Sequence, residues 1–298
     1  MGALTDEHPG DHLPAAGDPG PALHRMLLGA RLRRLRETSG LTPLQAGAAI
    51  QVGAAEIAEL ERGGTGCRLR EVIGLCDRYG VTDQAERVTL LQLARQANSP
   101  GWWAAYADVI PSWFERLVGL EQAAGCVRGF EVQRVPGLLQ TPEYAAAAIR
   151  LGHGGEPARS LERRLEVRLL RQRVLRQRPP LRLWAIIDES VLRRPIGGRA
   201  TLFRQLQHLI DMSELPNVTV QVLPFRAAGP AAGGPIVLLD MRQGQLGDIV
   251  FLEQLASARY VDGADEVSFY RQALDLLAVR AAPPEASRTI LRDLARDL

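Results

Sequence analysis

Three carboxylates in the second half of the sequence have the chemistry of a general acid or base. Asp188 closes the apolar run at 181–188, Glu189 follows it, and Glu253 lies in a second apolar run at 248–255. If both runs form strands with alternating faces, Asp188 and Glu253 can point inward, where burial raises a carboxyl pKa toward neutrality. These three residues are the candidate catalytic groups. Ion pairs with the abundant arginines are the competing explanation.

Aromatic and polar side chains in the same half could line a pocket for a flat or apolar small molecule. The candidate ligand-binding residues are Trp102, Trp103, Trp113, Arg134, Gln140, Tyr144, Arg168, Arg171, Trp184 and Arg193. A hydrophobic seam between two domains is the alternative explanation for the aromatic group at 102–114. The sequence does not name the ligand.

Several kinds of cofactor chemistry find no support. All 36 basic residues are arginine, so there is no lysine for a Schiff base or a phosphate-binding loop. Cys67, Cys76 and Cys126 are an odd number without C-x-x-C spacing, which argues against a disulfide framework and a zinc site. Neither a dinucleotide fingerprint nor a G-x-S-x-G motif is present. We expect no metal and no cofactor.

The composition is that of an ordinary globular protein. The chain has 298 residues, of which 46% are hydrophobic and 23% charged, and its length suggests about two domains. No apolar run approaches the roughly 18 residues that span a bilayer. The first 24 residues contain four Gly and four Pro but no apolar signal core. We expect a disordered tail at 1–24 and a cytoplasmic protein without a membrane partner.

Two patterns of hydrophobic spacing divide the rest. Apolar residues three and four apart through 25–97 predict consecutive short helices. The break at 98–101 places a domain boundary near Ser99. Beyond it the patterns predict helices at 112–127, 141–151, 158–178, 199–214 and 264–280, and strands at 181–188, 217–224, 235–241 and 248–255. The predicted fold class is therefore α+β: an all-α domain at 25–98, then helices packed on a mixed sheet at 99–298.

The stretch IQVGAAEIAELERG, residues 50–63, has the spacing of the second helix of a helix-turn-helix, whose N-terminal residues reach DNA base edges. The side chains that would meet DNA are Ala54, Ala55, Glu56 and Glu59. Alanine can contact only a thymine methyl group, and two carboxylates repel phosphates. We therefore predict that DNA binding is weak or absent, while a carboxylate near the helix N-terminus still favours the helix itself.

The chain resembles the actinomycete helix-turn-helix regulators of the xenobiotic-response-element type that carry a large C-terminal domain of uncharacterised function. The runs that carry this resemblance are LGARLRRLRETSGLT, ERGG, LCDRYGVTD, PGWWAAYADVIPSWFERLVGLEQAA, VPGLLQTPEYA, IDESVLRRPIGG, LPNVTVQVLPF and IVFLEQL. The resemblance implies transcriptional control of development or secondary metabolism, usually as a homodimer and often beside a small partner protein. The second helix of the helix-turn-helix, called the reading helix below, departs from the family pattern.

Two functions of different class follow. In the first, the helix-turn-helix persists as a scaffold and the C-terminal domain binds a small molecule, with a cofactor-free condensation or cyclisation in antibiotic biosynthesis as the candidate reaction. In the second, the chain is a transcriptional repressor controlled by a ligand or partner. Its DNA contacts would come from the reading-helix residues named above together with Arg33, Gln45, Arg62, Arg68 and Arg70.

Overall fold

The structure is a computed structural model that describes residues 20–227, 234–241 and 246–298. Contacts divide these residues into two compact units. The first holds the described residues up to Ala105 together with Val118–Ala123, and the second holds Tyr106–Leu117 and most of the described residues from Ala124 to the C-terminus. The tail predicted at 1–24 lies outside the described residues as far as residue 19, and Gly20 begins the first helix.

The first unit is helical, as the spacing predicted. Local signals in the sequence set its helix ends: Thr42 and Gln45 form a reciprocal capping box at the start of α2, and Asp83 caps α5 through the Ala85 amide. The helices of this unit are α1 (Gly20–Thr38), α2 (Pro43–Ile50), α3 (Ala54–Glu61), α4 (Leu69–Arg78) and α5 (Gln84–Ala97), followed by the 3-10 helix η2 (Trp102–Tyr106).

One hydrophobic core holds these five α-helices together. Leu32, Ile57 and Leu75, from three different helices, are almost fully buried in it. Helix α1 passes so close to the end of α3 that a Cβ on Gly29 would lie 2.4 Å from the Leu60 carbonyl oxygen. Only glycine permits this approach, so the position of α3 against α1 is fixed by backbone contact as well as by side chains.

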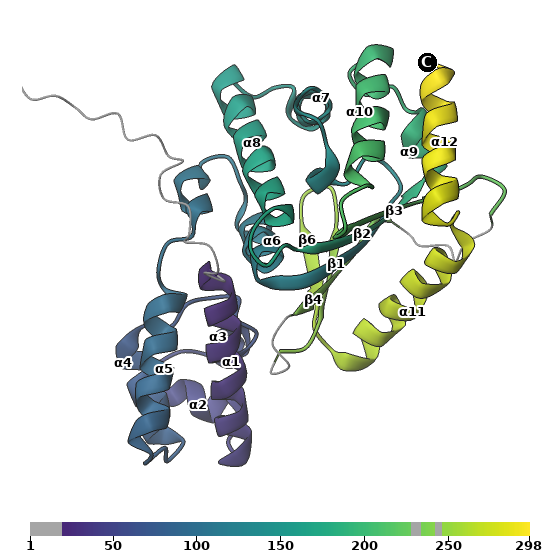
Figure 1. Cartoon of the computed structure of the whole chain (residues 1–298). Helices are drawn as coiled ribbons and strands as arrows, with labels where there is room; N and C mark the ends of the chain where they lie inside the picture. The colour runs from purple at the N-terminus through teal and green to yellow at the C-terminus, as the bar shows by residue number, and fades with distance from the viewer. Residues whose placement is uncertain (1–19, 228–233, 242–245) are drawn as a thin grey trace, which may run out of the picture. The chain divides into compact units, whose positions relative to one another are not determined.

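The second unit is built on a six-stranded mixed sheet (Figure 1). Its strand order is β3-β2-β1-β4-β5-β6, with β1, β2 and β3 parallel and each later strand antiparallel to its neighbour. The strands are β1 (Ala124–Glu131), β2 (Arg182–Asp188), β3 (Val218–Leu223), β4 (Ile236–Met241), β5 (Ile249–Glu253) and β6 (Ala258–Val261).

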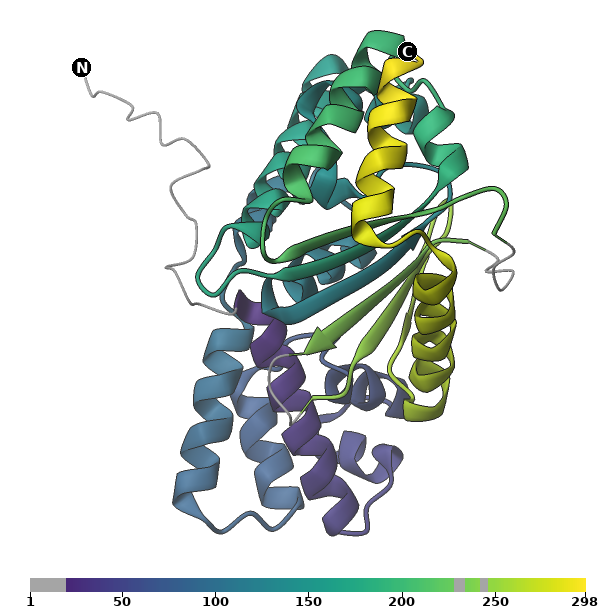
Figure 2. The same cartoon turned by 45° about the vertical axis from the view of Figure 1, so that its right-hand side comes forward.

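Helices cover both faces of this sheet. They are the Ser112–Leu117 part of α6 (Ser112–Ala123), α7 (Pro142–His153), α8 (Ala158–Arg171), α9 (Glu189–Arg193), α10 (Arg199–Met212), α11 (Ala264–Arg280) and α12 (Pro284–Arg296), with 3-10 helices η3 (Gly137–Leu139) and η4 (Gln172–Leu175). Figures 1 and 2 show α11 on one face and α7, α8, α10 and α12 on the opposite face. The predicted α+β fold class is confirmed.

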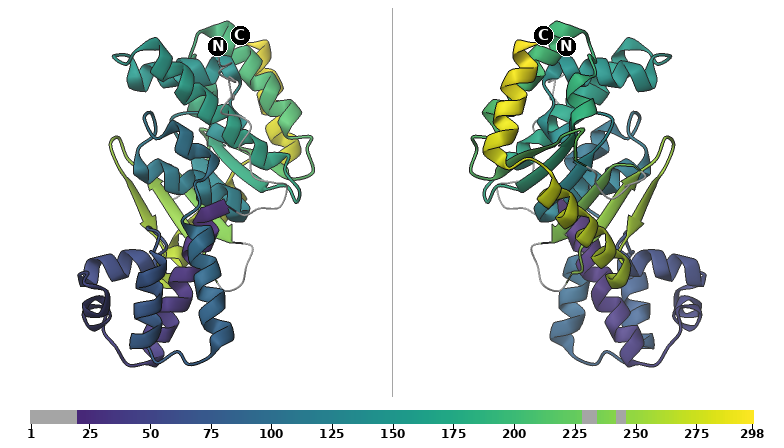
Figure 3. Two further views of the ribbon diagram at one scale, coloured as in Figure 1. Left: turned by 90° about the vertical axis from the view of Figure 1, so that its left-hand side faces the viewer. Right: turned by 90° about the vertical axis from the view of Figure 1, so that its right-hand side faces the viewer.

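The face beneath α11 contains a continuous apolar core. Phe130, Leu238 and Val250 of three adjacent strands pack against Leu274 and Leu277 of α11. Helix α12 follows after a bend and returns over the other face, where it contacts α10 and β3 (Figure 3). Among the described residues, no helix is both long and apolar enough to cross a bilayer.

The structure corrects several predicted elements. The helix predicted at 112–127 ends at Ala123, and β1 takes the residues that follow, because a short apolar run fits a buried strand as well as a helix end. The arginine-rich helix predicted at 158–178 ends as an α-helix at Arg171. Strand β6 and helix α12 were not predicted, although Pro284 in the first turn of α12 is a typical start signal.

Candidate functional site

Two carboxylates lie at the same edge of the sheet. Glu131 is the last residue of β1 and Glu253 is the last residue of β5. Gly129 pairs with Val237, which pairs with Phe251, so Glu131 and Glu253 follow two residues later at the same level and on the same face. In open sheets flanked by helices, ligands bind outside the carboxyl ends of the strands. This edge is therefore the place to look for a site.

Three arginines converge on these carboxylates. Arg134 lies just beyond β1, and Arg168 and Arg171 lie one turn apart on α8. Their positive charges all act on the Glu131 carboxyl group. The group Glu131, Arg134, Arg168, Arg171 and Glu253 is called the edge cluster below. It contains three cations and two acids drawn from four segments of the second unit.

Hydrogen bonds fix the loop that follows β1. Gln140 is buried, donates through Nε2 to the Val135 carbonyl oxygen at 2.7 Å, and accepts from Arg168 Nη1 at 2.9 Å. The hydroxyl of Tyr144 accepts from the Val135 amide at 3.3 Å. Gln205 also ties this loop to α10, donating to the Leu139 carbonyl oxygen at 2.7 Å and accepting from an amide at 2.8 Å. The loop thus presents its polar groups in a fixed arrangement.

The protonation states in the edge cluster are unusual. Burial, and secondarily the charge of Glu253, raise the pKa of Glu131 to about 8 in spite of the three arginines. Burial, and secondarily Arg171 and Arg134, lower the pKa of Arg168 to about 10. Among the described residues, neither Glu131 nor Arg168 forms an ion pair with a neighbour, and the only hydrogen bond of the Arg168 guanidinium goes to Gln140. Glu131 can therefore hold or release a proton near neutral pH.

Sequence patterns brought every member of the edge cluster except Glu131 into consideration, together with Gln140 and Tyr144. Arg134, Gln140, Tyr144 and Arg168 all lie around Glu131, which was overlooked because β1 was assigned to the end of a helix. An apolar stretch that ends on an acidic residue, at 124–131, was the available signal.

The three predicted catalytic carboxylates are placed differently from the prediction. Glu253 lies on the same face of the sheet as Glu131 but is exposed, because β5 ends there, and its charge acts on Glu131. Asp188 is half-buried and caps α9, where its Oδ1 accepts from the Ser190 amide at 2.9 Å. Glu189 accepts from the Phe225 amide at 3.0 Å and from Arg193 Nε at 2.8 Å. Asp188 and Glu189 therefore have structural partners and do not belong to the edge cluster.

The predicted aromatic pocket does not form as one wall. Trp102 and Trp103 belong to the first unit and pack edge to face at 5.9 Å. Trp113 stacks on Phe251 at 6.4 Å, on the face of the sheet that carries Glu131. Trp184 lies on the opposite face, where its indole N–H donates to Gln221 at 2.6 Å. Trp113 on α6 and Trp184 on β2 thus lie on opposite faces of the sheet, which sequence order alone does not show.

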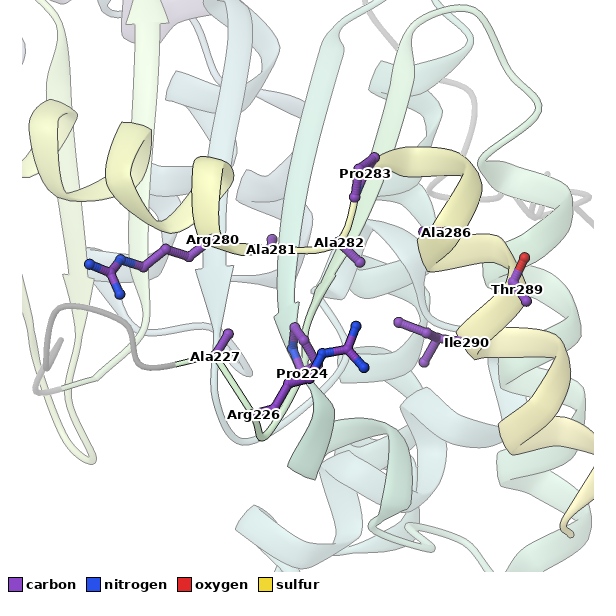
Figure 4. A pocket seen from close by; sticks show the side chains of 10 residues that line it. All are labelled: Pro224, Arg226, Ala227, Arg280, Ala281, Ala282, Pro283, Ala286, Thr289 and Ile290. Carbon is purple, nitrogen blue, oxygen red and sulfur yellow. The ribbon is translucent and has the colours of Figure 1, made fainter.

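A separate cavity of about 610 Å³ lies where β3 ends and the chain bends from α11 to α12 (Figure 4). Ala281, Ala282 and Pro283 line it at the bend, and Arg226 points toward Ile290, whereas the Arg280 side chain extends away. No predicted site residue lines it. Among the described residues, no group of three or more His, Cys, Asp or Glu side chains is arranged to hold a metal ion.

The helix-turn-helix has the expected form. Helices α2 and α3 are joined by a turn in which Gln51 adopts the left-handed conformation, with φ 60°, where glycine is more usual. On α3, Ala55 and Glu56 are exposed, and Ala54 is half-buried. A Cβ on Gly53 would lie 2.8 Å from Glu56 Oε2, so this carboxylate folds back over the helix N-terminus. It occupies the positive end that could otherwise attract a phosphate.

The polar residues proposed for DNA contact are largely engaged within the fold. Glu59 accepts from Arg62 Nη2 at 2.7 Å, and Arg33 donates to Glu37 at 2.9 Å. The Gln45 side-chain oxygen accepts from the Thr42 amide at 2.9 Å. Arg68 and Arg70 remain exposed, with Arg68 3.8 Å from Glu71. The N-terminal half of the reading helix α3 thus presents methyl groups and a carboxylate.

Two protein-family models match parts of the chain. Residues 114–293, more than half of the chain, match the model described as a domain of unknown function (DUF5753), and residues 27–90 match the model described as a helix-turn-helix domain. Searches of curated proteins and of solved structures found no match to the chain.

Proposed function

The chain belongs to the family defined by the domain of unknown function DUF5753, and from this premise we propose that it works through a small-molecule site at its edge cluster rather than by reading DNA sequence. A helix-turn-helix domain, which is typical of DNA-binding regulators, precedes the DUF5753 domain. The observation that carries the proposal is the convergence of Glu131, Arg134 and Arg168 at the carboxyl edge of the sheet without a direct ion pair among them.

Charged groups that lie close together without a direct ion pair destabilise a fold if their role is only structural. A buried charge is normally neutralised by a partner in contact, because desolvation otherwise disfavours the charged form. In the edge cluster the pKa of the Arg168 guanidinium is lowered and the pKa of the Glu131 carboxyl group is raised. Titratable groups perturbed in this way and gathered at one edge are characteristic of binding and catalytic sites. The fixed loop beyond β1 supports the same interpretation.

The proton on Glu131 also gives this site the means for cofactor-free acid–base catalysis. A condensation or cyclisation needs its reacting groups oriented and one proton moved, and a carboxyl with a pKa near 8 can serve both as acid and as base at neutral pH. This reaction class is the catalytic form of the proposal. On the family resemblance, we further propose a cytoplasmic homodimer of the xenobiotic-response-element type that acts in secondary metabolism.

The second candidate function is that of a DNA-binding regulator. The observation in its favour is the intact helix-turn-helix, whose geometry is preserved by close packing of α3 against α1 at Gly29. Arg68 and Arg70 are exposed beyond α3 and could hold phosphates. Against it stand Glu56 and Glu59, which would place negative charge beside the DNA phosphates. A phosphate that no cation neutralises adds nothing to the affinity, and the slope of log K against log salt is then shallower by about 0.9.

Incubation of the purified full chain with a metabolite extract from a strain that lacks its gene tests the proposal. We expect mass spectrometry of the ultrafiltered complex to find a retained or chemically altered small molecule. The variant Arg168→Gln should lose it, whereas Arg292→Gln, an exposed change on α12, should keep it. A gel shift against the chain's own promoter, at physiological ionic strength, examines the second candidate. A tight, site-selective DNA complex without any retained metabolite would overturn the proposal.

A further inference from the structure

We propose that the edge cluster binds a small organic acid, whose oxyanion is held by Arg134 and Arg168 while Glu131 donates a hydrogen bond to it. This inference rests on the small-molecule function proposed above and specifies the class of ligand. An oxyanion here means a carboxylate or a phosphate ester on a body that is otherwise uncharged.

The charge of the cluster selects an anion. The positive charges of Arg134, Arg168 and Arg171 all act on Glu131, whereas Glu253 is the one acid whose charge acts on it. Protonation of Glu131 removes a negative charge from the cluster. Burial is the main cause of the lowered pKa of Arg168, and repulsion from Arg171 and Arg134 lowers this pKa further. An incoming anion would relieve this repulsion, whereas a cationic ligand would increase it.

The arginine donors are positioned for such a ligand. A guanidinium has five N–H donors in a planar fork that matches two oxygens of a carboxylate or phosphate. Arg168 directs Nη1 to Gln140 Oε1, which orients the fork and leaves its other donors for a ligand. Gln140 in turn is held by the Val135 carbonyl oxygen. The guanidinium is thus oriented before the ligand arrives, which lowers the entropic cost of binding.

Aromatic rings on the same face indicate an apolar body for the acid. The Arg171 guanidinium lies over the Phe114 ring, with its carbon 4.7 Å from the ring centroid. Phe114 packs edge to face with Trp113 at 5.8 Å, and Trp113 stacks on Phe251. Phe114 is half-buried. These rings border the cluster on the side of α6 and suit a flat or apolar group attached to the oxyanion.

A purely structural ion-pair network is the competing explanation, and it makes the opposite geometric prediction. In such a network Arg168 or Arg134 would contact Glu131 or Glu253 directly, as Arg193 contacts Glu189 at 2.7 Å elsewhere in the same unit. Among the described residues no such contact joins members of the cluster to Glu131. The groups that face Glu131 are Glu253 from β5, Arg134 from the loop, Arg168 and Arg171 from α8, and the Tyr144 phenol from α7.

Thermal unfolding with simple probes tests the ligand class. The probes are benzoate, phenyl phosphate and the neutral analogue benzamide, each added to the full chain at constant ionic strength near pH 6.5. We expect at least one of the two anions to raise the Tm in the millimolar range, and benzamide not to do so. Whichever anion has the larger effect identifies the oxyanion. Equal stabilisation by benzamide, or no response to either anion, would overturn the proposal.

Variants separate binding from folding. Arg168→Met should reduce the affinity for the anion about ten-fold or more, because a bidentate charge-assisted contact is lost, while Arg292→Gln should leave it unchanged. In the absence of anion, Arg134→Met should not lower the Tm, since Arg134 is a half-buried cation that makes no hydrogen bond or ion pair with the described residues. A clear fall in Tm without anion would support the ion-pair network and contradict the proposal.

The pH dependence examines Glu131 directly. Anion affinity should fall as the pH rises through about 8, because Glu131 then loses the proton that it donates. Glu131→Gln should remove this dependence, since the amide still donates, and a dependence retained in Glu131→Gln would exclude the role of Glu131. If the metabolite experiment instead retains a neutral or cationic compound, the proposed function stands and this inference fails.

Discussion

The guanidinium of Arg36 and the carboxylate of Glu61 form two parallel hydrogen bonds in the interior of the helical unit. Nε donates to Oε1 at 2.6 Å and Nη2 donates to Oε2 at 2.9 Å. Both side chains are less than a tenth exposed, and Arg36 also donates to the Leu41 carbonyl oxygen at 2.8 Å. The pair joins the end of α1 to the end of α3, so α3 is held in place whatever its outer face presents.

Removal of one partner of this pair should be strongly destabilising. We expect Glu61→Ala to lower the free energy of unfolding of the helical unit by about 3–5 kcal/mol, because a buried guanidinium is left without its carboxylate. The double variant Arg36→Met with Glu61→Leu should cost less than the single change. Urea unfolding followed by circular dichroism measures both. A single variant that is no less stable than the double variant would contradict this account.

Charge on α3 should control the affinity for DNA. The double variant Glu56→Lys with Glu59→Arg replaces two acids by two cations and releases Arg62 from its ion pair with Glu59. We expect tighter non-specific binding to duplex DNA and a salt slope steeper by about 0.9 for each new phosphate contact. Fluorescence anisotropy across a salt series measures this. The control is Glu285→Lys with Asp293→Arg on α12, where the same change in net charge should have little effect.

Stability should decrease with rising pH because of Glu131. Its pKa is raised from the usual 4.5 to about 8, so the folded chain binds this proton more tightly than the unfolded chain. The stabilisation is complete below about 4.5 and is lost as the pH rises toward 8. Glu131→Gln should therefore be relatively more stable than the parent at pH 8.5 than at pH 5. Parallel curves for the two proteins across this range would show that Glu131 is not perturbed.

Glu189 should matter for folding and not for ligand binding. Glu189→Gln weakens the ion pair with Arg193 and the acceptor for the Phe225 amide, and we expect a loss of about 1–3 kcal/mol in the free energy of unfolding. Retention of the metabolite should be unchanged below the unfolding temperature. Exposed Glu285→Gln serves as the matched control. If Glu189→Gln abolished retention or turnover while remaining folded, the catalytic role first considered for Glu189 would be restored.

The local parts of this description could be predicted from the sequence. Leu28 with Leu32 and Ile57 with Leu60 repeat at helical spacing, and Thr42 with Gln45 marks the start of a helix, because caps and periodicity involve residues that are close along the chain. The charge character of α3 follows in the same way, since an exposed helix face depends only on its own residues. The later strands were predicted from their alternating or continuous apolar runs.

The edge cluster could not be predicted in the same way. Residues 124–131 fit a helix end and a buried strand equally well, and only pairing with β2 and β4 decides between them. Trp113 and Trp184 were grouped by their residue type, yet Trp113 on α6 stacks on Phe251, whereas Trp184 on β2 lies on the opposite face of the sheet. Asp188 and Glu189 looked available until the Ser190 and Phe225 amides were seen to engage them.

The sequence by itself determined the helical unit, the carboxylates on α3 and the α+β class, because each depends on spacing within a few turns or one strand. Only the tertiary structure decided that Glu131 and Glu253 share a face of the sheet and that Arg134, Arg168 and Arg171 surround them. Sheet pairing is between segments far apart in the chain, and burial of a charge depends on all the segments that pack around it.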